Sequence, residues 1–173
     1  MKISVRNSPD KKFTPYIQRA AEFYGKILIP NTRINNNISV DIKFNRTIDN
    51  YGLTGVEGCN SAKKARDFLI EIHSDIGARN ILETLAHEMV HVKQFAYGEI
   101  NDSLSVWKGQ AVDLDEVDYW WLPWEIEAHG MEAGLLTKFA VKEKLYNVLE
   151  GFRNPNSQIP VRKIVWKHNS NGS

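Results

Sequence analysis

Apolar residues recur at intervals of three and four from Gly77 to Phe95, and this pattern constrains the fold of the chain more than any other feature. Such spacing is typical of a helix that buries one face against a neighbouring layer. The apolar positions are Ile81, Leu82, Leu85, Ala86, Met89, Val92 and Phe95. Ser74-Asp75 offers an N-cap, and Gly98 is suited to end the helix. The rest of the chain must therefore supply a layer on which this helix packs.

Four segments predict the other regular elements. Residues 13–28 have helical spacing, and Pro123 begins a second long helix that we expect to reach about Leu149. Residues 38–44 and 67–73 alternate apolar and polar side chains, which is typical of strands with one buried face. These segments predict a sheet with helices against it.

The intervening segments are less regular. Gly52, Gly55 and Gly58 indicate a loop or a tight hairpin, and residues 106–112 have the pattern of a short strand before an acidic loop. A chain of 173 residues suits one compact domain. We expect an α+β fold in which a small mixed sheet packs against the Gly77–Phe95 helix and the second long helix crosses it. The domain is predicted to span residues 1–153, with a C-terminal tail at residues 154–173.

The charge and cysteine content narrow the function classes. The chain has 22 basic and 21 acidic side chains and a net charge of +1, so nucleic acid is an unlikely main partner. Its one cysteine, Cys59, excludes an internal disulfide and a multi-thiolate zinc site, and we expect it to be buried. With no signal-like N-terminus and no span of about 20 apolar residues, the expectation is a cytoplasmic protein without a membrane partner.

Residues 87–91 read His-Glu-Met-Val-His within the predicted helix. Positions i and i+4 lie on one helical face, so His87 and His91 can both reach one metal ion. Zinc binds imidazole nitrogen at about 2.0–2.1 Å and favours a tetrahedral shell. Glu88 lies one step round the helix, where it can reach a water on the metal and act as general base. The motif predicts a catalytic Zn²⁺ site.

A catalytic zinc requires a third protein ligand and one open position. The segment from Trp124 to His129 offers Glu125, Glu127 and His129. On a helix, Glu125, His129 and Glu132 share a face and Glu127 points elsewhere. Glu125 is therefore the favoured ligand, with His129 beside it to orient the site. Glu127 and His129 stay open as alternative ligands.

These two motifs give the chain a resemblance to the gluzincins, metallopeptidases that combine His-Glu-x-x-His with a glutamate on a downstream helix. Glu125-Ile126-Glu127-Ala128 matches their Glu-x-x-Ala-Asp pattern through the alanine, and His129 stands where the family often has aspartate. The layout also looks like small phage-encoded or SprT-like zinc-peptidase domains, although the downstream histidine motif of the latter is not matched. The resemblance covers roughly residues 67–136. It implies a zincin-like fold and a hydrolase that cleaves peptide bonds.

Other residues have secondary roles in this hypothesis. Tyr97, Tyr119 and His129 are candidates to donate a hydrogen bond to the oxyanion. His73 is expected to be the polar end of an edge strand, which could bind an extended peptide by strand addition. The tryptophans are expected mainly in the core; they are Trp107, Trp120, Trp121 and Trp124.

The expected partner is a peptide or protein substrate. Two alternatives remain: a zinc-binding protein of the same fold without efficient catalysis, and a hydrolase that uses the same site on another substrate. Retention of Glu88 argues against the first, because a purely structural zinc site does not need this carboxylate.

Overall fold

The computed structural model describes residues 1–60 and 64–145, which form a mixed α+β structure. The helices are α1 (Thr14–Leu28), α2 (Thr32–Asn36), α3 (Ala78–Tyr97) and α4 (Pro123–Glu143), with a short 3-10 helix, η1 (Tyr119–Trp121). The strands are β1 (Lys2–Arg6), β2 (Ser39–Asn45), β3 (Gly52–Cys59), β4 (Ala65–His73), β5 (Val106–Trp107) and β6 (Gln110–Ala111). The predicted α+β class, with a mixed sheet against the motif helix, is confirmed.

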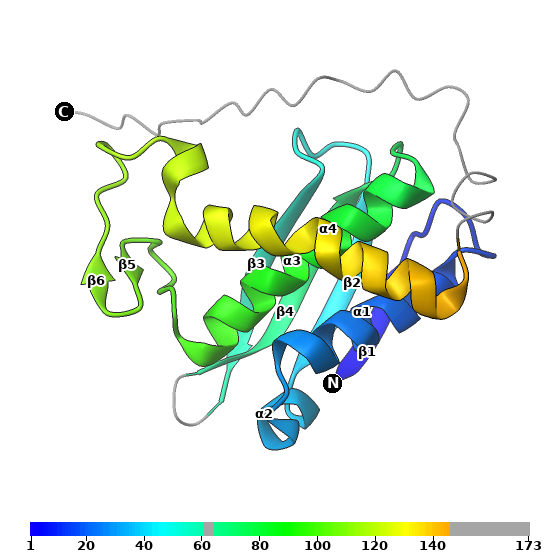
Figure 1. Cartoon of the computed structure of the whole chain (residues 1–173), viewed down its shortest axis with the longest axis horizontal. Helices are drawn as coiled ribbons and strands as arrows, with labels where there is room; N and C mark the ends of the chain where they lie inside the picture. The colour runs from blue at the N-terminus through cyan, green and yellow to red at the C-terminus, as the bar shows by residue number, and fades with distance from the viewer. Residues whose placement is uncertain (61–63, 146–173) are drawn as a thin grey trace.

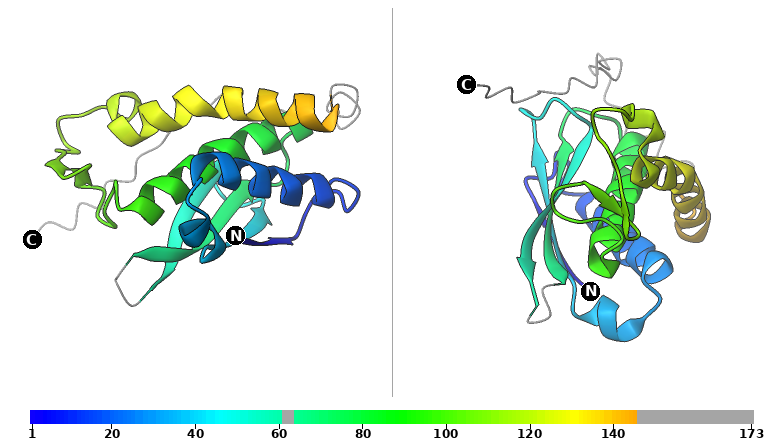
Figure 2. Two further views of the ribbon diagram at one scale, coloured as in Figure 1. Left: turned by 60° about the horizontal axis from the view of Figure 1, so that its bottom comes forward. Right: turned by 90° about the vertical axis from the view of Figure 1, so that its left-hand side faces the viewer.

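The main sheet has the strand order β1-β2-β4-β3. β1, β2 and β4 run parallel, and β3 is antiparallel to β4 and forms one edge. Burial alternates along β2, where Val40, Ile42 and Phe44 face the core. Helices α1 and α3 cover this face, and α4 lies outside them (Figures 1 and 2). The motif helix is thus held between the sheet and α4.

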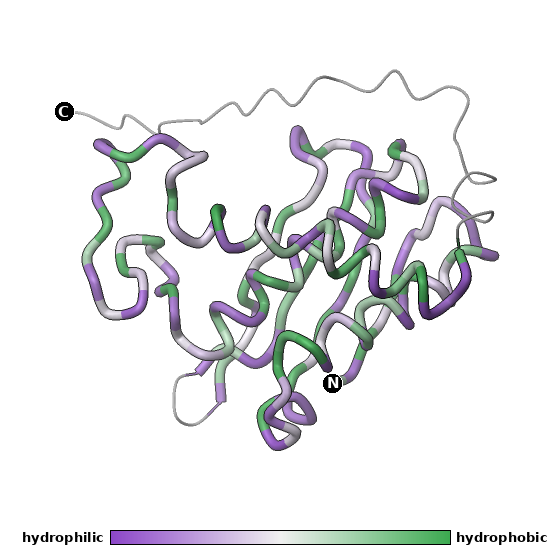
Figure 3. The backbone as a smooth tube through the Cα atoms, in the orientation of Figure 1, coloured by the Kyte–Doolittle hydropathy of each residue, from purple (hydrophilic) through white to green (hydrophobic). Residues whose placement is uncertain are grey.

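The core forms where α1 and α3 meet the sheet. Hydrophobic and hydrophilic residues alternate along these elements, as expected when each element buries one face (Figure 3). Helix α3 is the most enclosed, because its residues contact the sheet, α1 and α4. It ends at Gly98, whose φ of 71° lies in the left-handed region that favours glycine. The predicted stop at Gly98 is confirmed, but the N-cap is Gly77 and not Ser74 or Asp75.

A smaller apolar cluster places the start of α4. Ile100, Leu122 and Trp124 are buried together, and Trp107 and Tyr119 pack against them. This cluster joins the β5–β6 hairpin and η1 to the end of α3. It therefore positions the first turn of α4 beside the motif.

Three predictions about strands need correction. The glycine-rich segment was expected to be a loop or a tight hairpin; the loop is wrong, because the segment is strand β3, which pairs antiparallel with the next strand, β4. The strand that ends at His73, β4, is internal, and the edge strands of the main sheet are β1 and β3. Residues 106–112 are not one strand but the β5–β6 hairpin, which turns where Lys108 and Gly109 have positive φ.

Several side-chain and boundary predictions also need correction. Cys59 is exposed, because it ends the edge strand β3. Trp124 is buried as expected, but Trp120 and Trp121 are exposed on η1. Helix α4 ends at Glu143 and not near Leu149. The expected tail and the domain boundary at residue 153 lie outside the described residues. Within residues 1–60 and 64–145, no helix is long and apolar enough to span a membrane.

Candidate metal centre

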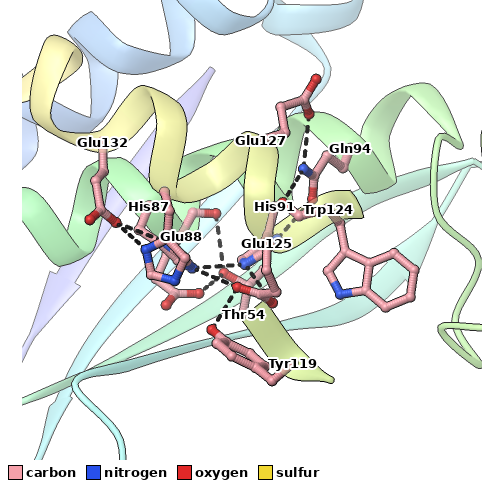
Figure 4. Close-up of polar contacts among 11 residues, drawn as sticks. Thr54, His87, Glu88, His91, Gln94, Tyr119, Trp124, Glu125, Glu127 and Glu132 are labelled. Carbon is pink, nitrogen blue, oxygen red and sulfur yellow. Dashed lines mark hydrogen bonds and ion pairs between the residues drawn. The ribbon is translucent and has the colours of Figure 1, made fainter. Parts of the chain in front are cut away.

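His87 and His91 lie one turn apart on α3 and are both buried, with 8% and 9% of their surface exposed. Their Nε2 atoms are 3.1 Å apart. Glu125, in the first turn of α4, places Oε2 3.2 Å from the Nε2 of His87 and Oε1 3.5 Å from the Nε2 of His91. The three predicted ligands are therefore brought together from two helices (Figure 4).

The size of this triangle can be compared with a zinc shell. Four ligands at about 2.0–2.1 Å in a tetrahedron lie about 3.3 Å from one another. The Nε2–Nε2 distance of 3.1 Å and the 3.2 Å from Nε2 of His87 to Oε2 of Glu125 are close to that value, whereas the 3.5 Å contact to His91 is made by the other carboxylate oxygen, Oε1. Two imidazoles and one carboxylate are also ligands that zinc commonly accepts. The three side chains are of the right chemical kind, and their ligand atoms lie within 4.8 Å of one another, close enough to share one ion.

The outer nitrogens of both histidines face hydrogen-bond acceptors. The Nδ1 of His87 lies 2.8 Å from Oε2 of Glu132, and the Nδ1 of His91 lies 2.8 Å from Oε1 of Gln94. With hydrogen on each Nδ1, the neutral rings turn two Nε2 lone pairs toward each other. Lone pairs at this distance repel, and either a proton on one Nε2 or a metal ion bound to both would relieve the repulsion.

The charged groups nearest the two histidines are carboxylates. Three carboxylates, those of Glu88, Glu125 and Glu132, contact or neighbour the two rings. Burial acts to lower the pKa of His87, but hydrogen bonds to Glu125 and Glu132 outweigh it and raise that pKa to about 10. Burial acts to raise the pKa of Glu125, but hydrogen bonds with both histidines hold it well below its usual range. A divalent cation offsets this negative charge more fully than one proton does.

Glu125 has its own support. Pro123 begins α4, and Leu122 at its N-cap is fixed in the smaller apolar cluster, so the glutamate projects from a rigid first turn. The hydroxyl of Tyr119 donates a hydrogen bond of 2.6 Å to Oε2 of Glu125. Tyr119, predicted as an oxyanion donor, thus lies at the site but contacts a ligand.

Glu88 lies outside the triangle, on the side of α3 that faces the edge strand. The hydroxyl of Thr54 donates to its Oε2 at 2.7 Å. A Cβ added at Gly52 would lie 2.5 Å from Cγ2 of Thr84 and 2.6 Å from Oε1 of Glu88. Only glycine fits at position 52 without displacing the glutamate. Strand β3 therefore positions Glu88 in two ways: Thr54 donates a hydrogen bond to it, and Gly52 leaves room for its carboxylate.

Of the remaining predicted residues, His129 lies beside the candidate ligands, and Glu127 and Tyr97 do not. Glu127 points away from the triangle and binds Lys93, as helical geometry suggests. His129 approaches the site, with its ring 4.5 Å from that of His87 and its Nδ1 3.3 Å from Glu132. His129 thus contacts the candidate site through His87 and Glu132. Tyr97 ends α3 and is exposed, and it makes none of the contacts that join these described residues.

Four supporting residues were not identified as such from the sequence: Gly52, Thr54, Gln94 and Glu132. Gln94 follows His91 by three positions on the same helix, and Glu132 had been placed on the face of Glu125 without a role. These two spacings were the available signals. Gly52 and Thr54 gave none, because only strand pairing brings them to α3.

Comparisons of this chain with protein families, with curated proteins and with solved structures found no match. The class of the protein is therefore argued from its own residues.

Proposed function

We propose that this chain is a zinc-dependent hydrolase with a zincin-like fold, and specifically a metallopeptidase of the gluzincin type. His87, His91 and Glu125 would hold the ion, and Glu88 would be the general base. The observation that supports the proposal is the convergence of two Nε2 atoms 3.1 Å apart and a carboxylate whose oxygens lie 3.2 and 3.5 Å from them, a set of groups that zinc accepts as ligands.

The catalytic roles follow from the chemistry of these groups. When bound, zinc supplies a Lewis acid that polarises a carbonyl and lowers the pKa of water to about 7. Glu88 neighbours the ligands without joining them, and Thr54 fixes one of its oxygens. Its carboxylate would accept the proton of the attacking water and return it to the leaving amine.

A peptide substrate is favoured by the position of β3. This strand is an edge of the main sheet and carries Thr54, which contacts Glu88. An extended peptide that pairs with the outer side of β3 would run past the catalytic carboxylate. The role of an edge strand, first expected for the strand ending at His73, is thus assigned to β3.

The test compares the wild type with Glu88→Gln. Zinc content is measured by elemental analysis, and hydrolysis is followed with fluorescein-labelled casein. We expect one zinc per chain in both proteins, and a loss of about 10²–10⁴-fold in rate for the variant because glutamine cannot accept the proton.

Each alternative has its own outcome in this experiment. A zinc-loaded wild type that cleaves no protein, peptide or ester would indicate a zinc-binding module. Cleavage of an ester but of no peptide would indicate a non-peptidase hydrolase. Equal rates in the two proteins would exclude Glu88 as the base.

A further inference from the structure

Gln94 is a polar side chain with no exposed surface, placed one turn after His91 on α3. Its Oε1 lies 2.8 Å from Nδ1 of His91. Its Nε2 donates to the carbonyl of Trp124 at 3.0 Å and to Oε2 of Glu127 at 2.9 Å. Every polar atom of the amide is thus engaged, as a buried amide requires.

These contacts determine which way the amide points. The Trp124 carbonyl and the Glu127 carboxylate can only accept hydrogen bonds, so the NH₂ group must face them. The carbonyl oxygen of Gln94 must then face His91. An amide oxygen can only accept, so Nδ1 of His91 carries the hydrogen and its Nε2 presents a lone pair.

Glu127 is itself held by cations. Nζ of Lys93 lies 3.0 Å from both oxygens of Glu127 and 2.7 Å from Glu99. Lys108 adds a longer contact to Glu127 at 3.4 Å. Glu127 is therefore fixed in place, and it is linked to His91 indirectly through Gln94.

We propose that Gln94, oriented by Glu127, is a positioning residue that sets the ring orientation and tautomer of His91 for zinc. The inference rests on the proposed zinc site but concerns a different residue pair. The carboxylate of Glu132 orients His87 and the amide of Gln94 orients His91, so each proposed ligand has its own hydrogen-bond partner. Orienting partners of this kind typically change metal affinity 10–100-fold when they are removed.

The test uses three variants and a matched control. Gln94→Leu removes the acceptor for His91. Gln94→Glu places a carboxylate against Glu127 with no donor between them. Gln94→Glu combined with Glu127→Gln restores a donor and an acceptor with the polarity reversed. Gln18→Glu, on the exposed face of α1, makes the same substitution away from the site.

Zinc affinity is measured by competition with a chelator, and stability of the zinc-free proteins by urea unfolding. We expect Gln94→Leu and Gln94→Glu to bind zinc 10–100-fold more weakly, Gln18→Glu to match the wild type, and the double variant to recover part of the loss, because the Trp124 carbonyl still lacks its donor. In ¹H–¹⁵N spectra of the zinc-loaded wild type, His91 should show a protected Nδ1–H, and Gln94→Leu should lose that protection.

The outcomes separate this inference from the proposed function. If the wild type binds zinc and both single variants bind it equally well, Gln94 does not position His91, and the zinc site stands. The same conclusion follows if the variants lose stability alone, or if the double variant is no better than Gln94→Glu. A wild type that binds no zinc overturns the proposed function and this inference with it.

Discussion

Replacing Gly52 by alanine tests whether strand β3 positions Glu88, the proposed general base. The added Cβ would lie 2.5 Å from Cγ2 of Thr84 and 2.6 Å from Oε1 of Glu88. Ordinary contacts between such atoms are about 3.5–4.0 Å, so these groups must move by about 1 Å. Glu88 is the freer to move, because its carboxylate ends a flexible side chain.

The magnitude follows from that displacement. A shift of about 1 Å at a reacting group can cost about 10²-fold in rate. Inserting a methyl group into packed surroundings costs about 1–3 kcal/mol of stability. Zinc affinity should change by much less than the 10–100-fold that follows the loss of a partner that supports a ligand. The added Cβ meets Thr84 and Glu88, and neither is a proposed ligand.

The assay is hydrolysis of labelled casein by zinc-loaded protein, with zinc affinity measured in parallel. Gly55→Ala is the matched control, because a Cβ there would meet nothing closer than the Leu69 carbonyl at 4.0 Å. It makes the same substitution on the same strand and should leave the rate unchanged. Full activity in Gly52→Ala would refute the account of Glu88. A large loss of zinc would show that the alanine disturbs the ligands instead.

Three further predictions concern hydroxyl groups. Tyr119→Phe should weaken zinc binding about tenfold in a chelator competition, because Glu125 loses its 2.6 Å hydrogen bond, and unchanged affinity would deny the tyrosine this role. Thr54→Val should lower kcat about tenfold with zinc retained, because Glu88 loses its 2.7 Å donor, and an effect on zinc instead would count against it. Burial raises the pKa of Tyr24 above its usual 10, so stability should hold below pH 10 and fall above it as the unfolded chain ionises. Urea unfolding at pH 8 and pH 11 should show a smaller loss for Tyr24→Phe than for the wild type, and equal losses would contradict the assignment.

The convergence of the three candidate ligands could be predicted from the sequence because it depends on local helical geometry. The spacing of His87 and His91 places both on one face of any helix, and the apolar pattern around them specifies the helix. The position of Glu125 follows from the same helical spacing, because Pro123 begins the second helix. Both steps depend only on helical periodicity, which is clear in the amino-acid sequence.

The features that could not be predicted from the sequence depend on contacts between segments that are distant along the chain. Strands β1 and β3 are ordered by pairing with β2 and β4, and the glycines of β3 conceal its alternation. The need for glycine at position 52 becomes clear only from the contact between this position and Glu88. The exposure of Trp120 likewise depends on how η1 lies over α4, which no periodicity predicts.

The most direct test of the central claim is the zinc dissociation constant of the wild type compared with Glu125→Ala, Glu127→Ala and His129→Ala. Glu125 faces both histidines at 3.2 and 3.5 Å, whereas Glu127 and His129 act through Gln94 and Glu132. The account predicts one zinc per wild-type chain, and a loss of affinity for Glu125→Ala well beyond the 10–100-fold expected of the other two. No zinc in the wild type, or a greater loss in Glu127→Ala or His129→Ala, would contradict it.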